Sequence, residues 1–455
     1  LSGLQITECA AKRCQGIFLH IPIRGKSGEP GERIVYEGAV YNCSARPLLV
    51  SVEQVFDGWE SLLADISLKA PQKPEENTSF SASAGSLLFL PGESAPLTAA
   101  VTIHENMVPG GHETTCLRVW GRDGEGSFQD SVSLQTLRRL PHPYLYHNAE
   151  GWKAVAGKLT AYNFYSKAWE KYRSAAESWV VTDPLSGRDF CYETKVEENV
   201  MSTAYLYAVT GERRHAEKLA DFYRRFSNPL TACPNLKKGC SQSYVQVGHF
   251  FQHLAIGLDI IYDSGVLSKQ ELTRMEQCFR IYMEILDVHV RDGHISNWLL
   301  SELTGALFCA LTLQDMDLAL RFAFGPGGIT DQFRYGVFND GWWHECSVGY
   351  NTWVSSMLLH TAHALLPFGY DLIHAAFRLP FNDEVSSTYQ CRPVPVKSGM
   401  YNRKWGGNLR NAVRIRDMFD AVVPFLDYRG VIFGIADSDE KKMDGVHFGS
   451  TYDHA

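Results

Sequence analysis

Long apolar runs are missing from this 455-residue sequence, and so is an excess of positive charge. No window of about 18 apolar residues occurs, so the sequence contains no membrane-spanning helix of the usual length. The formal net charge is −8, whereas a nucleic-acid-binding protein normally carries a basic stripe. An anionic ligand is still compatible with this composition, because a local basic surface can exist on an acidic protein.

The standard signatures of several site classes are also missing. The sequence has no P-loop, no GxGxxG motif at a helix start, no GxSxG elbow and no HExxH motif. None of the 11 cysteines forms a CxxC pair. Two close pairs, Cys9 with Cys14 and Cys233 with Cys240, would suit short-loop disulfides in an oxidising compartment. Free buried thiols are the simpler interpretation.

Residues 1–138 have the pattern of an immunoglobulin-like, antiparallel β-sandwich, which we expect to be an accessory domain. Short apolar or alternating runs recur, and turn-rich pieces such as GKSGEPGE (25–32) and VPGGHE (108–113) separate them. This spacing of short strands is typical of a sandwich. The predicted strands are Gly16–Ile23, Arg33–Asn42, Leu48–Phe56, Ser86–Leu90, Leu97–His104, Cys116–Trp120 and Ser131–Leu137.

The sequence changes character after a proline-containing segment at 139–150, which we expect to be a linker. Helical periodicity then dominates residues 151–455, the predicted catalytic domain. The predicted helices are Ala149–Thr160, Tyr162–Val181, Val196–Thr210, Glu212–Phe226, Tyr244–Ser264, Ser268–Val290, Ser296–Leu313, Met316–Phe324, Gly349–Leu365 and Asn411–Val422.

Helix boundaries in this region carry clear stop and start signals. Gly211 separates two predicted helices, and Ser268 with Glu271 three residues later forms a capping box. Helices joined by such short turns indicate stacked helical hairpins, and an incomplete α/α toroid fits them. An irregular bundle or a solenoid would also fit, although no fixed repeat period supports a consensus solenoid.

The two ends of the chain suggest a piece of a longer protein. It begins at Leu1 with no basic and apolar leader, and it ends in the polar segment GIADSDEKKMDGVHFGSTYDHA. We expect the gene to continue, and a downstream β-domain could supply a divalent metal. A signal peptide removed from the chain would make the protein secreted or periplasmic, whereas a chain without one would be cytoplasmic.

His249 and His253 are four residues apart on one face of a predicted helix. That spacing can bind zinc, but no Glu adjoins the first His and no third ligand is evident, so we predict no metal here. A polar face on a helix that lines a cleft and a pair of structural histidines are the two interpretations left, and the sequence does not choose between them.

Asn297 lies at another predicted helix start. Ser296 is suited to be the N-cap, which would put Asn297 in the first helical turn, where asparagine is not a favoured residue. Either Asn297 itself caps the helix, or its amide points into a cleft and holds a carboxylate.

The densest chemical stretch of the sequence runs over residues 339–353. Asp340-Gly341 predicts a turn, and aromatic and polar residues alternate after it: Trp342, Trp343, His344, Glu345 and Tyr350. A sugar-binding cleft needs aromatic faces beside hydrogen-bonding groups, and this stretch offers both. A hydrogen-bonded aromatic turn with no ligand is the simpler alternative.

These pieces resemble the heparinase II/III-like and alginate-lyase-like polysaccharide lyases, which pair an α/α toroid with β-sandwich domains. The resemblance covers roughly residues 145–440. It rests on the order and spacing of four segments: Asn297-Trp298 at a helix start, Asp340-Gly341 through Tyr350, His253–Asp263, and Gly434–Asp439. Most members also carry a large β-domain after the toroid, and we expect none within residues 151–455.

The resemblance implies β-elimination on a uronic-acid polysaccharide, either a glycosaminoglycan or alginate. In the family an Asn neutralises the uronate carboxylate, a Tyr acts as acid or base, and histidines complete the site. Carried over to this chain, the catalytic residues are Asn297, Tyr350, His344, His249 and His253. From their own chemistry, Trp298, Trp342 and Trp343 would stack on sugar, and Glu345 would also bind substrate. Arg403, Lys404 and Arg410, in a Gly-rich loop, could contact a substrate carboxylate or sulfate, and solvated surface charge is the alternative.

Three other functions are compatible with the sequence. An α/α-toroid glycoside hydrolase would need two carboxylic acids, for which Asp340 and Glu345 are candidates. A C5 epimerase would share the proton abstraction without cleaving a bond, and a carbohydrate-binding protein would have no catalytic step. The sequence does not determine the polymer, the choice between endo and exo action, or the oligomeric state.

Overall fold

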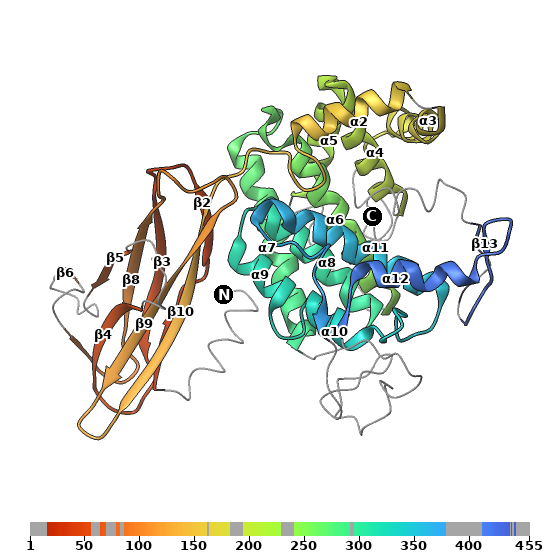
Figure 1. The fold of residues 1–455 in the computed structure, drawn as a ribbon. Coiled ribbons are helices and arrows are strands. Elements are labelled where there is room, and N and C mark those ends of the chain that lie inside the picture. Colours follow the sequence, from red (N-terminus) through yellow and green to blue (C-terminus); the bar gives the residue numbers. More distant parts are fainter. Residues whose placement is uncertain are drawn as a thin grey trace. The chain divides into compact units, whose positions relative to one another are not determined.

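The computed structural model describes residues 16–55, 64–69, 79–81, 86–161, 163–182, 194–228, 241–291, 295–378, 412–436, 438 and 441–442. Within these residues the chain is a mixed α and β protein, as predicted, with strands first and helices after them (Figure 1). It divides into two compact units, Leu1–Leu140 with Gln314–Leu318, and Pro141–Leu313 with Ala319–Ala455. No helix in the described part has the length and apolarity that crossing a lipid bilayer requires.

The first unit contains two five-stranded sheets among the described residues. The first sheet has the order β1 (Ile17–His20), β3 (Arg33–Asn42), β8 (Ser94–Thr102), β5 (Ala64–Lys69) and β6 (Ser79–Ser81). The second has the order β2 (Gly25–Gly28), β10 (Ser127–Arg138), β9 (His112–Arg122), β4 (Leu48–Val55) and β7 (Leu87–Phe89). Neighbouring strands are antiparallel except β2 and β10, which pair in parallel.

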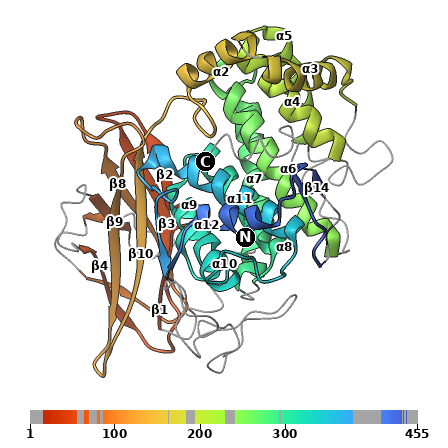
Figure 2. The ribbon, with the colours of Figure 1, turned by 45° about the vertical axis from the view of Figure 1, so that its right-hand side comes forward.

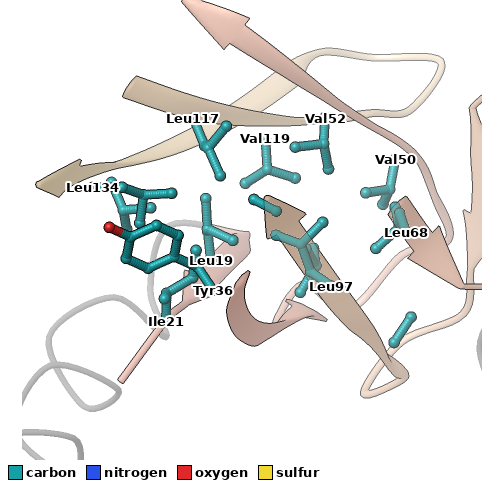
Figure 3. Close-up of a cluster of buried hydrophobic side chains, with 14 of the residues drawn as sticks. Leu19, Ile21, Tyr36, Val50, Val52, Leu68, Leu97, Leu117, Val119 and Leu134 are labelled. Atoms are coloured by element: carbon teal, nitrogen blue, oxygen red, sulfur yellow. The ribbon is translucent and has the colours of Figure 1, made fainter. Parts of the chain in front are cut away.

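One hydrophobic core joins the two sheets. Alternate residues of each strand point inward, so that Leu97 of β8 and Leu19 of β1 face Val52 of β4 and Val119 of β9 (Figure 3). The period of two along a strand accounts for this arrangement. Buried Tyr36 adds a polar tie, because its hydroxyl donates a 2.9 Å hydrogen bond to the Gln135 carbonyl of the other sheet.

The turn predicted at GKSGEPGE is partly wrong. Its first four residues, Gly25–Gly28, form β2 and pair in parallel register with Gln135–Arg138. The backbone N–H of Gln135 also donates to the Arg24 carbonyl at 2.7 Å. Glycine disfavours a strand locally, so the pairing with β10 overrides the local preference.

The second unit consists mainly of helices. They are α2 (Ala149–Ala161), α3 (Asn163–Ser178), α4 (Thr194–Thr210), α5 (Arg213–Phe226), α6 (Ser241–Ile261), α7 (Lys269–Arg291), α8 (Asn297–Thr312), α9 (Met316–Phe324), α10 (Ile329–Gly336), α11 (Val348–Leu365) and α12 (Ile415–Val422). Most begin and end within a few residues of the predicted positions. The 3.6-residue periodicity of their apolar positions explains this agreement. The predicted toroidal arrangement stays a prediction.

Two helix predictions need correction. Helix α10 (Ile329–Gly336) was not predicted, because it has only eight residues and follows a glycine-rich turn. The helix expected from Asn411 begins instead at Ile415, where the Asp417 carboxylate accepts from the Arg414 N–H at 2.8 Å. Residues Ala412–Val413 before it form a strand that pairs with Phe377–Arg378.

The predicted caps at two helix starts are confirmed. Ser296 is the N-cap of α8, and its hydroxyl accepts from the Leu299 N–H at 3.2 Å. Glu271 accepts from the Ser268 N–H at 2.7 Å, which completes the capping box before α7. Each cap satisfies a backbone donor that the helix cannot use internally.

Helices α6 and α8 pack with their backbones in close approach, and they run side by side in Figures 1 and 2. A Cβ at Gly248 of α6 would lie 2.4 Å from the Ser301 carbonyl of α8. A Cβ at Gly305 of α8 would lie 2.4 Å from the Gly248 carbonyl. The two glycines therefore set the distance between the helices that carry His249 and Asn297.

Replacing Gly248 with Ala is expected to destabilise the second unit. The added methyl group meets backbone atoms that cannot rotate away, so the cost should be about 1–3 kcal/mol of unfolding free energy. The matched control is Gly157→Ala on α2, where a Cβ meets no atom within 4 Å. That control should be neutral, or stabilising by up to about 1 kcal/mol. Denaturant titration measures both; equal effects would contradict the close approach of the helices.

Candidate functional site

Asn297 is the first residue of α8, and its side chain is fully buried. Ser296 supplies the N-cap, so the alternative that Asn297 caps the helix is wrong. Its amide nitrogen Nδ2 instead donates a 2.8 Å hydrogen bond to Oε2 of Glu345. The amide oxygen Oδ1 is shielded from solvent and has no hydrogen-bond partner in the described structure. Leaving a buried acceptor unpaired costs about 1–3 kcal/mol, which makes Oδ1 a candidate contact for a ligand.

Glu345 accepts a second hydrogen bond at the same oxygen. The indole Nε1 of Trp343 donates to Oε2 at 2.6 Å. The predicted hydrolase role of Glu345 would need a carboxyl group that can exchange a proton with substrate. An oxygen that already accepts from two N–H groups suits a fixed acceptor instead.

Trp343 is fully buried, as Asn297 is, and its predicted stacking on a sugar stays a prediction. Its backbone N–H donates to Oδ1 of Asn351 at 2.8 Å, and the Asn351 amide donates to the Met418 carbonyl at 3.0 Å. The indole ring also fills the space where a Cβ at Gly336 would stand, 2.2 Å from a ring carbon. Trp343 is thus fixed at its backbone and around its ring.

His344 follows directly and is held as a neutral imidazole. Burial lowers its pKa to about 4, although a hydrogen bond to the Ile295 backbone opposes the shift. Its ring nitrogen Nε2 is shielded and has no hydrogen-bond partner in the described structure. The bond to Ile295 must therefore involve Nδ1, and Nε2 is left as a bare acceptor. A neutral imidazole with a bare nitrogen is the form that accepts a proton.

Tyr350 lies in the first turn of α11. The Ser347 hydroxyl caps this helix by accepting from the Tyr350 N–H at 3.4 Å. The chain reaches the cap through Cys346, whose φ of 53° is in the left-handed region. Tyr350 is half-buried, and Trp353 lies nearly one turn further along the same helix.

His249 on α6 meets Trp353. The indole Nε1 donates to Nε2 of His249 at 2.6 Å, and the rings stack with centroids 5.2 Å apart. Burial lowers the pKa of His249 to about 4, so it is neutral at neutral pH. Because Nε2 already accepts this bond, His249 is less suited than His344 to take a proton from substrate. No signal in the sequence indicated that Trp353 would be its partner.

His253 lies beside a glutamate that sequence reasoning missed. Its Nδ1 has no hydrogen-bond partner and is 3.9 Å from Oε1 of Glu197 on α4. Burial and the neighbouring His249 and His360 lower the pKa of His253 to about 3, while burial and Glu198 raise that of Glu197 to about 8. Both groups are therefore neutral at neutral pH, and they form no ion pair there.

The structure brings the predicted residues together in two groups. Glu345 joins Asn297 to Trp343, with His344 next in the chain; we call these four residues the Asn297 cluster. His249 and His253 form a second group with Trp353 and Glu197. Helix α11 connects the two groups, because its Asn351 accepts from the Trp343 N–H and its Trp353 donates to His249.

The other predicted binding residues differ in their exposure and contacts. Trp298 and Trp342 are half-buried, and Trp342 packs edge-on against Phe425 with centroids 5.4 Å apart. Asp340, the second hydrolase candidate, accepts from the Trp342 N–H at 3.1 Å. Arg403, Lys404 and Arg410 lie outside the described residues. Over the described ranges, no cluster of three or more His, Cys, Asp or Glu side chains is arranged to hold a metal ion.

Comparison with known proteins gives weak likenesses only. No family model matches the chain, and no curated protein matches its sequence. An alginate lyase from Bacteroides ovatus aligns over 64% of this chain and 84% of its own, at 13% identity and a TM-score of 0.45. A polysaccharide lyase aligns over 80% and 56%, at 11% identity and a TM-score of 0.21. With TM-scores below 0.5, neither likeness decides the fold or activity of this chain.

Replacing His344 with Gln should make the fold less sensitive to acid. The imidazole titrates near 6.5 in the unfolded chain but near 4 in the folded protein. Its neutral form therefore stabilises the fold above about pH 6.5, and this contribution is lost as the pH falls from 6.5 to 4. Between pH 7 and 5, the wild type should lose about 1–2 kcal/mol more unfolding free energy than the variant. Guanidinium titrations at both pH values measure this difference, and equal losses would show that His344 titrates normally.

Proposed function

We propose that this chain is a polysaccharide lyase that cleaves a uronic-acid-containing polysaccharide, a glycosaminoglycan or alginate, by β-elimination. One observation carries the proposal. A fully buried Asn297 amide, fixed by Glu345, lies in the same cluster as a neutral His344 whose Nε2 is unpaired. Such a pair offers an uncharged donor for a carboxylate and a base for a neighbouring proton. The predicted β-sandwich followed by an incomplete α/α toroid, and a secreted or periplasmic location, belong to this proposal.

The reaction needs these groups because the C5 proton of a uronate is weakly acidic. A base takes that proton, the electron pair forms the C4–C5 double bond, and the C4–O4 bond breaks. An acid then supplies a proton to the leaving O4. Negative charge accumulates on the carboxyl group as the C5 proton leaves, so donors placed at that group stabilise the transition state.

Each chemical role has a residue suited to it. The Asn297 amide has a second N–H, beyond the one given to Glu345, for the uronate carboxyl group. His344 takes the C5 proton at Nε2. Tyr350 donates to O4, because a phenol ordinarily keeps its proton at neutral pH. His249 and His253 line the neighbouring part of the site as neutral groups, and half-buried Trp298 offers an aromatic face.

The first test is an absorbance screen of uronate polymers with single-site variants. Wild-type protein should generate an unsaturated uronate from at least one of hyaluronan, chondroitin, heparan, heparin or alginate. Asn297→Ala and Tyr350→Phe should each lower kcat about 100-fold or more, as removing one transition-state donor does elsewhere. The matched control is Tyr428→Phe, because Tyr428 is 97% exposed. That control should keep wild-type turnover, and no absorbance rise on any polymer would refute the lyase proposal.

The second test is the pH profile of kcat/KM. If His344 is the base and its pKa is about 4, the neutral form persists well below pH 6.5. The acidic limb of kcat/KM should therefore fall near pH 4, rather than near the usual histidine value of about 6.5. A limb near 6.5 in the wild type would assign the base to a more exposed group.

The hydrolase alternative finds less support. Its two carboxyl groups, Asp340 and Glu345, each already accept hydrogen bonds from their own segment of chain. A hydrolase would release saturated sugar ends, so product analysis by mass separates the two reactions. A protein that only binds carbohydrate would tolerate Tyr350→Phe without loss of function.

A further inference from the structure

We propose that Glu345 is a positioning residue, which fixes the rotation of the Asn297 amide so that one N–H stays available to the substrate carboxyl group. This inference rests on the lyase function proposed above and goes beyond it by giving Glu345 a role other than substrate contact. The evidence is the pair of hydrogen bonds that converge on Oε2 of Glu345.

An asparagine amide can turn around, because its oxygen and nitrogen ends are nearly equal in size. Its neighbours decide which end points where. Oε2 of Glu345 accepts from both the Trp343 indole and the Asn297 amide, so Glu345 selects the N–H end of Asn297. The 2.8 Å distance to Asn297 is in the normal range of N–H···O hydrogen bonds.

Glu345 can impose this orientation because it is itself held. Trp343 donates to the same oxygen at 2.6 Å, and the indole is immobilised by burial and by the backbone bond to Asn351. The positions of Trp343, Glu345 and Asn297 are therefore coupled. The rigid core residue Trp343 holds Glu345, and Glu345 in turn holds the Asn297 amide that is proposed to contact substrate.

The orientation has a direct consequence for the reaction. With Nδ2 turned toward Glu345, its second hydrogen can donate to the uronate carboxyl group as charge builds there. In a flipped amide, Oδ1 of Asn297 would face Oε2 of Glu345, and the two acceptor oxygens would repel each other. A freely rotating amide would spend part of its time in that orientation. Small losses of alignment at a reacting group are costly, since a misplacement of about 1 Å can lower a rate about 100-fold.

The test is a double-mutant cycle of Glu345→Ala and Asn297→Ala, read as kcat, KM and thermal midpoint. Glu345→Ala alone should lower kcat about 10–100-fold with a smaller change in KM, because the amide acts mainly in the transition state. In the Asn297→Ala background the same change should lower kcat by less than about 3-fold, since the two residues act as a unit. Glu345→Gln keeps an acceptor oxygen and should recover most of the lost turnover.

The matched control is Glu217→Ala, which breaks an exposed 2.9 Å pair with Arg213 on α5 and should leave kcat unchanged. Losses of kcat that simply multiply in the double variant would overturn the positioning role. So would a normal kcat in a folded Glu345→Ala protein. If Glu345→Ala fails to fold, Glu345→Asp replaces it in the cycle, because the shorter side chain withdraws the acceptor while keeping the charge.

A structural readout separates this proposal from the lyase function. If wild-type protein cleaves no uronate polymer, the function proposal fails, and a neutron crystal structure of Glu345→Ala, which locates the amide hydrogens of Asn297, still decides its orientation. An Asn297 amide that turns, or occupies two orientations, would support positioning by Glu345. An amide in the wild-type orientation would overturn it.

Discussion

The candidate site depends on one carboxylate oxygen of a half-buried residue. Oε2 of Glu345 accepts from the Asn297 amide and from the Trp343 indole, and so joins the start of α8 to the turn before α11. Both donor residues, Asn297 and Trp343, are fully buried. If Glu345 moved away, neither N–H group could replace the lost hydrogen bond with one to water. The cost of leaving such groups unpaired makes this contact a structural constraint as well as a chemical one.

Burial also decides the charge state of the surrounding histidines. His249, His253 and His344 all have lowered pKa values, and in each case burial is the largest cause. The site therefore holds neutral imidazoles, which serve as acceptors or bases and not as fixed cations.

Local sequence signals predicted the elements well where a physical preference acts within a few residues. The cap at Ser296, the capping box at Glu271 and the bounds of α9 follow from short-range hydrogen bonding and periodicity. Prediction failed where distant pairing decided the outcome. Gly25–Gly28 forms a strand because it pairs with β10, and Ala412–Val413 forms a strand because it pairs with Phe377–Arg378.

For the candidate site residues, too, local sequence decided some properties and tertiary packing decided the others. Local sequence signals drew attention to Asn297 in a first helical turn and to the dense aromatic and polar stretch at 339–353. The family resemblance then selected Asn297 and Tyr350 from them as the predicted catalytic residues. The sequence could not show that Glu345 faces Asn297, that Trp343 is fully buried, or that His253 lies beside Glu197. These contacts join residues far apart in the chain, and only the packing of whole helices brings them together. The sequence by itself therefore determined which chemical groups are present and where helices begin, while the tertiary structure decided their partners and their protonation, because both depend on what excludes water around them.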